Sequence, residues 1–102
     1  MTNKILLKLY VTGETPKSKR AIANIQSICE NELLAGQYEL VIIDVLEKPQ
    51  LAEDEKIMAT PTLTKASPPP MRRVIGDLSD AKKVLLGLDI EPYKAKSREK
   101  GR

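Results

Sequence analysis

The segment Ala59-Thr60-Pro61-Thr62-Leu63 predicts a β-strand that the chain enters through a Thr-Pro peptide bond. Proline has no amide proton to give to a sheet, so within strands it is confined to edges, bulges and the first position. The strand is therefore expected to begin just after Pro61. The segment also follows the strand–helix–strand pattern of the first half of the chain and precedes the shorter elements of the second half.

The part before this strand predicts a strand, a long helix and a second strand. Residues 4–11 are rich in β-formers, and residues 38–45 are almost continuously apolar, which is typical of an interior parallel strand. Between them Thr15 is a good helix N-cap and Pro16 suits the first helical position, while Gly36 is expected to end the helix. Apolar residues recur at helical spacing at Ala21, Ile22, Ile25, Ile28, Cys29 and Leu33. These elements predict a right-handed βαβ unit.

The remaining elements follow in short succession. Pro49 opens a helix that is expected to run to Met58, and a strand is expected at residues 62–65. After a turn at residues 67–70, a strand at residues 72–76 is expected to pair with the preceding strand as a hairpin. A last helix starts after Asp77, with Ser79 as its expected cap. The predicted order, βαβαββα in an α/β fold, is the thioredoxin-like arrangement.

Redox chemistry is not expected of this scaffold. In thioredoxin-like folds a cis-proline, here Pro61, faces a Cys-x-x-Cys in the turn after the first strand. That turn is Thr12-Gly13-Glu14-Thr15, which contains no cysteine. The single Cys29 lies on the apolar stripe of the first helix and is expected in the core. The chain has no histidine, so the commonest general base and metal ligand are missing too. We therefore expect a binding protein without enzymatic activity or cofactor.

Composition predicts one domain, residues 1–93, followed by a basic and flexible tail, residues 94–102. The tail carries a net charge of +4, the rest of the chain −1. Such a tail is the feature through which a nucleic acid would bind, but only 3% of the residues are aromatic, so nucleic-acid binding is not favoured. No apolar run reaches the roughly 18 residues of a membrane span. One unpaired thiol suits a reducing, cytoplasmic location.

Two further patterns do not suit a plain scaffold. Lys17, Lys19 and Arg20 stand at the positive end of the first helix dipole, and Glu30 and Glu32 at its negative end. Each such charge costs about 0.3–1 kcal/mol. The arrangement is either tolerated on a solvated face or kept for an acidic partner surface.

The second pattern is a segment with two interpretations. Residues 84–90 match both an amphipathic helix and an alternating strand. Gly87 weakens the helix, and Asp89 lies near its negative end. One interpretation is an ordinary helix that ends at Gly87; the other is a fold-switching segment. The bonds before Pro61, Pro68, Pro69 and Pro70 isomerise slowly, so a refolding that changes several of them would be slow.

These motifs in combination resemble the KaiB family of cyanobacterial circadian clock proteins. The resemblance rests on Leu7-Lys8-Leu9-Tyr10-Val11-Thr12-Gly13, Ile43-Asp44-Val45-Leu46-Glu47-Lys48-Pro49-Gln50-Leu51-Ala52, Ala59-Thr60-Pro61-Thr62-Leu63, Pro68-Pro69-Pro70, Ile75-Gly76-Asp77-Leu78-Ser79 and Val84-Leu85-Leu86-Gly87-Leu88-Asp89. It implies a non-enzymatic regulator with two folds: a homo-oligomeric ground state, tetramer or dimer, of order βαββααβ and a rare thioredoxin-like monomer. The monomer is expected to bind the N-terminal ATPase ring of a KaiC-type protein, to capture KaiA, to displace SasA and to recruit CikA.

The resemblance also assigns residues. It implies that Lys56 contacts the KaiC-type partner and that Arg20 and Arg73 take part in assembly. Gly87 and Asp89 match the pair that tunes the two folds, so Gly87→Ala and Asp89→Arg are expected to raise the thioredoxin-like population.

Two departures from the family pattern keep a second hypothesis open. The family commonly has an acidic tail and a Tyr-Ala-Leu-Lys strand, whereas here the tail is basic and the strand reads Tyr38-Glu39-Leu40-Val41. In the family the edge of that strand contacts KaiA. The alternative is therefore an accessory member that acts with a KaiC-type ATPase alone, in timing or stress responses.

Overall fold

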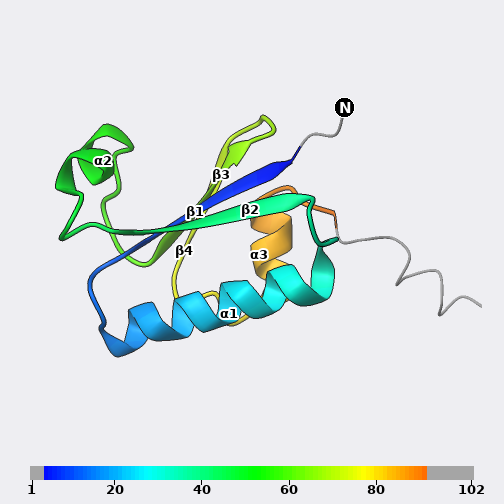
Figure 1. Ribbon diagram of the computed structural model, residues 1–102, viewed down its shortest axis with the longest axis horizontal. Coiled ribbons are helices and arrows are strands. Elements are labelled where there is room, and N and C mark those ends of the chain that lie inside the picture. The colour runs from blue at the N-terminus through cyan, green and yellow to red at the C-terminus, as the bar shows by residue number, and fades with distance from the viewer. Residues whose placement is uncertain (1–3, 92–102) are drawn as a thin grey trace, which may run out of the picture.

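The computed structural model describes residues 4–91 of the 102-residue chain. The elements are β1 (Ile5–Val11), α1 (Pro16–Glu32), β2 (Tyr38–Asp44), α2 (Pro49–Asp54), β3 (Thr62–Ser67), β4 (Arg72–Ile75) and α3 (Ala81–Gly87). The order is βαβαββα, and the predicted thioredoxin-like arrangement is confirmed (Figure 1). The predicted tail, residues 94–102, lies outside the described residues.

One four-stranded sheet organises the molecule, with strand order β2-β1-β3-β4. β1 runs parallel to β2, with Leu9 opposite Ile42, and antiparallel to β3, with Leu9 opposite Leu63. β3 and β4 form the antiparallel hairpin that the sequence predicts. The parallel β1–β2 pair joined by α1 confirms the predicted βαβ unit.

The hydrophobic core lies between one face of the sheet and the helices α1 and α3. Leu7, Leu9 and Val11 alternate along β1 and point into it, because successive strand residues face opposite sides. Each buried aliphatic side chain contributes about 1.5–3 kcal/mol. α1 adds Ala21, Ile25, Ile28 and Cys29, α3 adds Val84 and Leu85, and the C-cap of α3 adds Leu88. The predicted helical stripe of α1 is thus its core face.

The start of α1 is as predicted, and its end is not. The Thr15 hydroxyl accepts from the Ser18 amide, and Pro16 takes the first turn. The helix ends at Glu32, however, because Leu33 adopts an extended conformation and caps it. Gly36, which the sequence prediction made the end of the helix, instead lies in the following turn with φ +86°.

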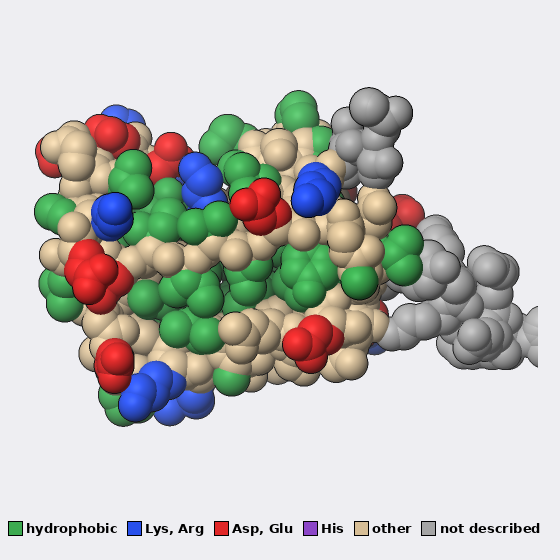
Figure 2. Space-filling model, viewed as in Figure 1, with side chains coloured by type: hydrophobic (Ala, Val, Ile, Leu, Met, Phe, Trp, Pro, Cys, Tyr) green, Lys and Arg blue, Asp and Glu red, His purple; other side chains and the backbone are tan. Residues whose placement is uncertain are grey.

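The prediction that the second strand lies inside the sheet is wrong. β2 is an edge strand, and Val41 and Ile42 are exposed on it. Its apolar composition therefore does not reflect burial on both faces, as it would in an interior parallel strand. Figure 2 shows apolar side chains on both sides of this edge.

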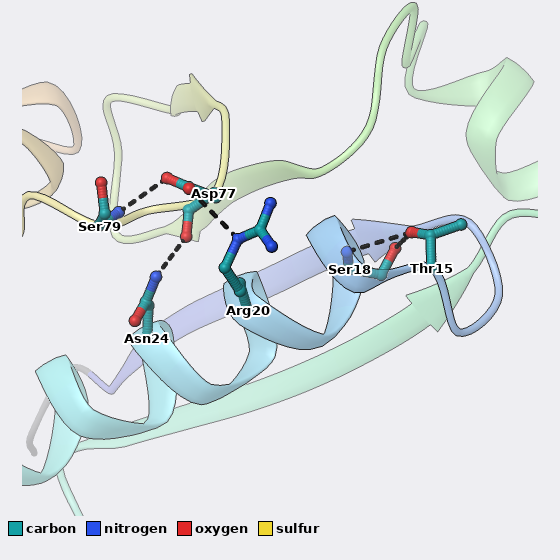
Figure 3. Close-up of polar contacts among 6 residues, drawn as sticks. All are labelled: Thr15, Ser18, Arg20, Asn24, Asp77 and Ser79. Atoms are coloured by element: carbon teal, nitrogen blue, oxygen red, sulfur yellow. Dashed lines mark hydrogen bonds and ion pairs between the residues drawn. The ribbon is translucent and has the colours of Figure 1, made fainter.

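Two helix boundaries also differ from prediction. α2 ends at Asp54 rather than near Met58, because Lys56 turns the backbone into the left-handed region with φ +56°. The cap of α3 is Asp80, whose side chain accepts from the Lys83 amide, and not Ser79. The Ser79 amide donates to Asp77 Oδ1 instead (Figure 3).

Residues 84–87 of the ambiguous segment are helical in this structure and form the end of α3. α3 takes the helix interpretation of residues 84–90, so the chain is in the thioredoxin-like arrangement rather than the alternative order. The Thr60-Pro61, Ser67-Pro68 and Pro69-Pro70 peptide bonds are cis.

Candidate docking surface

Hydroxyl groups occupy the place where a thioredoxin-like fold carries its dithiol. The Thr12 and Thr60 hydroxyl oxygens lie 2.6 Å apart and join the β1–α1 turn to the residue before Pro61. The Ser18 hydroxyl, nearly fully buried, donates to the Thr12 carbonyl and accepts from its amide. Thr15 completes the group through Ser18 (Figure 3). These neutral hydroxyls bond to one another and cannot form a disulfide.

Cys29 is a core residue, as predicted. Its side chain belongs to the hydrophobic core and is 1% exposed. Burial, with a smaller contribution from Glu30, raises the pKa of the thiol to about 11. A thiol with this pKa carries almost no thiolate at neutral pH, so Cys29 is not a nucleophile.

Lys56 is exposed and holds an unusual backbone position. The Ile57 amide donates to the Ala52 carbonyl at 2.9 Å and the Lys56 amide to the Glu53 carbonyl at 3.1 Å. This is the Schellman pattern of helix termination, with Lys56 in the left-handed position that glycine usually takes. A non-glycine residue there costs about 1–2 kcal/mol.

The structure brings Arg73 to this same loop. From β4, its Nη2 donates to the Glu55 carbonyl at 2.9 Å and its Nη1 to the Lys56 carbonyl at 3.2 Å. Met58 follows two residues after Lys56 and is 89% exposed. Lys56 and Arg73, two of the three assembly residues that the sequence predicts, therefore form one local structure.

Arg20 engages a different loop. Its Nε lies 3.7 Å from Asp77 Oδ2, in the segment between β4 and α3, and the side chain is 57% exposed. One turn further along α1, Asn24 Nδ2 donates to the Asp77 carbonyl at 2.7 Å. Figure 3 shows both side chains reaching from α1 to Asp77. The charges of α1 stand as predicted, with no acidic residue in its first turn and no basic residue in its last.

The edge of β2 offers an apolar surface. Val41 and Ile42 border a groove of about 380 Å³ that is also lined by residues of α2 and the loop before it. The lining residues are Lys8, Val41, Ile42, Ile43, Asp44, Glu47, Lys48 and Leu51. Glu39, one of the departures from the family pattern, is exposed on the same strand. The edge therefore combines free backbone groups with exposed apolar side chains.

The predicted fold-switch pair lies at the end of α3. Gly87 is the last helical residue, and Asp89 follows with φ +59°. The Asp89 amide donates to the Leu86 carbonyl and the Ile90 amide to the Leu85 carbonyl, which is a second Schellman pattern. Asp89 therefore terminates α3 in the same way that Lys56 terminates α2.

Sequence reasoning missed several residues that build these sites. Asn24 and Asp77 join α1 to the β4–α3 loop. In the sheet, the side chains of Tyr10 and Lys65 are buried, with exposed fractions of 1% and 3%. Only Asn24 had a signal in the sequence, because it stands four residues after Arg20 on the same helix face.

Residues 4–91 contain neither a cluster of metal ligands nor a membrane-spanning helix. Within that range no three potential metal ligands among Cys, Asp and Glu side chains gather at one point. None of the helices described is both long and apolar enough to cross a bilayer.

The fold and the site define a thioredoxin-like domain that carries hydroxyls in place of the redox dithiol. Comparison with known structures agrees. The N-terminal domain of Synechococcus elongatus SasA matches with a TM-score of 0.72 and 27% identity, covering 87% of each chain. Mitochondrial thioredoxin 3 of Saccharomyces cerevisiae matches with a TM-score of 0.67 and 17% identity, over 85% of this chain and 78% of that one. The second likeness concerns the fold alone.

The chain belongs to the KaiB family: the KaiB domain matches residues 8–90. A circadian clock protein KaiB3 of Synechocystis is 60% identical over 90 residues, which cover 88% of this chain and 87% of the relative. A circadian clock oscillator protein KaiB of Prochlorococcus marinus is 61% identical over 85 residues, covering 83% and 80%. These relatives are named as clock proteins and not as enzymes, and the predicted family resemblance is confirmed.

Proposed function

We propose that this protein is a non-enzymatic clock regulator that binds the N-terminal ATPase ring of a KaiC-type protein and antagonises KaiA-stimulated KaiC phosphorylation. The observation that carries the proposal is the identity of about 60% to circadian clock KaiB proteins over most of the chain. The matched residues, 8–90, include the whole segment between α2 and β3, residues 55–61, here called the Lys56 loop. The cytoplasm, where a KaiC-type ATPase would be met, is the proposed location.

The Lys56 loop is the proposed contact with the ring. Lys56 is exposed and holds a left-handed backbone conformation that glycine or asparagine would adopt at lower cost. A strained residue at an exposed position supports a role for its side chain outside the fold. A lysine ammonium suits an acidic partner surface, and Arg20 at the start of α1 adds charge of the same sign.

The likeness to the SasA domain supports competition for one site. A shared fold, with 27% identity over 87% of each chain, supports recognition of the two domains by the same partner. We propose that this protein displaces a SasA-type kinase from the ring, and that a CikA-type kinase joins the resulting complex. The β2 edge, with Val41 and Ile42 exposed, is the proposed place for capture of KaiA, because an extended segment adds readily to a free strand edge.

The proposed ground state is a homo-oligomer, a tetramer or a dimer, with the alternative order of elements. Gly87, Asp89, Pro61 and Pro68–Pro70 are the proposed switch residues. Gly87 and Asp89 lie where α3 ends, so they act on the length of a helix that only one of the two folds contains.

Gel filtration with purified KaiC-type ring and ATP tests the proposal. The wild-type chain is expected to co-elute with the ring after hours, and Lys56→Glu is expected to lose co-elution. Lys82→Glu is the matched control, since Lys82 is an exposed lysine on α3 and carries the same charge change. Failure of the wild-type chain to co-elute with any such ring of its host would contradict the proposal.

Addition of KaiA to a phosphorylation assay separates the proposal from its alternative. Suppression of KaiA-stimulated KaiC phosphorylation by this protein is expected. Ring binding without that suppression would identify an accessory member that acts with a KaiC-type ATPase alone. The identities to KaiB3 and to oscillator KaiB proteins are nearly equal, so they do not favour this alternative.

A further inference from the structure

Arg73 makes an unusual pair of contacts with the backbone. Its two terminal nitrogens donate to two consecutive carbonyls, those of Glu55 and Lys56, which lie 18 and 17 residues away in the sequence. A guanidinium presents its donors in a fixed planar fork, so it can bond both carbonyls at once, whereas the compact ammonium of lysine cannot match that geometry.

Both carbonyls lie just past the end of α2, at its C-cap Glu55 and at Lys56. The helix dipole makes this end negative, so the positive charge of Arg73 is well placed there. The Schellman bonds use the carbonyls of Ala52 and Glu53, and Arg73 bonds two carbonyls further along the chain, those of Glu55 and Lys56. The left-handed turn at Lys56 is thus held from two sides, by α2 and by β4.

Tyr10 is a buried residue whose pKa depends on this loop and on Arg73. The tyrosine is 1% exposed in the central strand β1. Burial raises the pKa of its hydroxyl, the charge of Glu55 raises it further, and the charge of Arg73 lowers it. The charges of the loop and of Arg73 are therefore felt at a buried side chain of the interior strand β1.

We propose that Arg73 is a positioning residue: its fork fixes the α2–β3 loop so that Lys56 projects in the orientation that an acidic surface of the ring requires. Arg73 then acts through Lys56 and not by its own contact with the partner. This inference rests on the proposed function and adds to it a division of roles between two basic residues.

A double-mutant cycle on the dissociation constant of the ring complex tests the division. Arg73→Ala is expected to weaken binding about tenfold, the change that loss of one charged-donor hydrogen bond produces. In a Lys56→Ala background the same change is expected to weaken binding less than about twofold, because no lysine remains to be positioned. Equal losses in both backgrounds would overturn the proposal, since direct contact or general destabilisation would act in each.

Two further variants control for charge. Arg72→Ala removes the same charge from the neighbouring β4 residue, on the opposite face of the sheet, and is expected to leave the affinity within about twofold of wild type. Arg73→Lys keeps the charge but loses the fork, so it is expected to bind as weakly as Arg73→Ala. Full affinity in Arg73→Lys would mean that charge alone suffices, and would refute the positioning role.

Amide hydrogen exchange gives a readout that needs no partner. In both Arg73→Ala and Arg73→Lys, the amides of Lys56 and Ile57 are expected to exchange about tenfold faster, while those of α1 are unchanged. Unchanged exchange at these two amides would overturn the inference even if binding falls. If the wild-type chain binds no ring, the proposed function fails, and exchange still decides whether Arg73 holds the loop.

Discussion

Gly87 and Val74 approach each other so closely that a Cβ added to Gly87 would lie 2.7 Å from Val74 Cγ2. Non-bonded carbon atoms do not approach each other to this distance, and a valine side chain has little freedom to rotate away. The contact joins the last residue of α3 to β4, which is partly buried here. The expected gain of Gly87→Ala in the thioredoxin-like fold is therefore opposed by a steric cost.

The first prediction concerns this pair. Alanine in place of Gly87 gains about 1 kcal/mol of helix propensity, and the Val74 contact takes part of that gain away. Val74→Ala removes the obstructing methyl, so Gly87→Ala is expected to stabilise the monomer more in that background, by at least about 0.5 kcal/mol. Urea unfolding of the four proteins measures the coupling, and strict additivity would show that Val74 moves aside without cost.

A second prediction concerns Asp89. Its φ of +59° favours glycine and then asparagine, and its negative charge stands at the negative end of α3. Stability of the thioredoxin-like monomer is therefore expected to rise from Val through Asp and Asn to Gly at this position. Asp89→Asn should gain about 0.3–1 kcal/mol, and Asp89→Val should lose about 1 kcal/mol. A stable Asp89→Val variant would contradict the left-handed assignment.

A third prediction separates stability from binding at Lys56. Lys56→Gly relieves the left-handed conformation and is expected to stabilise the fold by about 1 kcal/mol. The same change removes the ammonium group and is expected to weaken ring binding at least about tenfold. Thermal unfolding and ring titration of one sample give both values. A glycine variant that is more stable and binds as well as wild type would exclude Lys56 from the interface.

The fourth prediction compares the two side chains that reach Asp77. Asn24→Ala loses a 2.7 Å hydrogen bond in a partly buried place and should cost about 1 kcal/mol. Arg20→Ala loses an exposed 3.7 Å ion pair and should cost less than about 0.5 kcal/mol. If Arg20 serves the partner, its alanine variant should nevertheless bind the ring more weakly than Asn24→Ala. The reverse order of binding would assign Arg20 to the fold alone.

The fifth prediction follows from the pKa of Cys29. The folded thiol titrates at about 11, above its ordinary value near 9, so the folded state holds its proton more tightly than the unfolded state. Stability from this group is thus intact below pH 9 and falls as the pH rises towards 11. Cys29→Ala should flatten that fall, leaving the contributions of Tyr10 and Tyr38, whose pKa values are also raised. Alkylation of native protein at pH 8 should be slow and should become fast in urea.

Local patterns in the sequence were sufficient for the order of elements. Thr15 and Pro16 mark the start of α1 through contacts within four residues, and the strand after Pro61 is equally local. The family resemblance led to Lys56, Arg20 and Arg73 but did not describe their surroundings. Each of these residues has its partner on a neighbouring or distant element.

The errors concern features that the tertiary structure decides. The sequence pattern of an apolar strand is the same whether another strand or solvent lies beside it. The edge position of β2 could therefore not be predicted from the sequence. The end of α2 depends on a left-handed lysine, which no propensity favours. The fork of Arg73 spans 17 to 18 residues, a separation at which side-chain contacts leave no periodic signal.

The free edge of β2 also bears on how abundant the protein can be. An uncovered strand that shows Val41 and Ile42 to water is a template for any other strand, including that of a second copy. Such self-pairing grows with concentration and removes the surface from use. Under the proposed exchange between two folds, a rare thioredoxin-like state would keep the number of bare edges small, so scarcity of this form would protect solubility as well as set its rate of encounter.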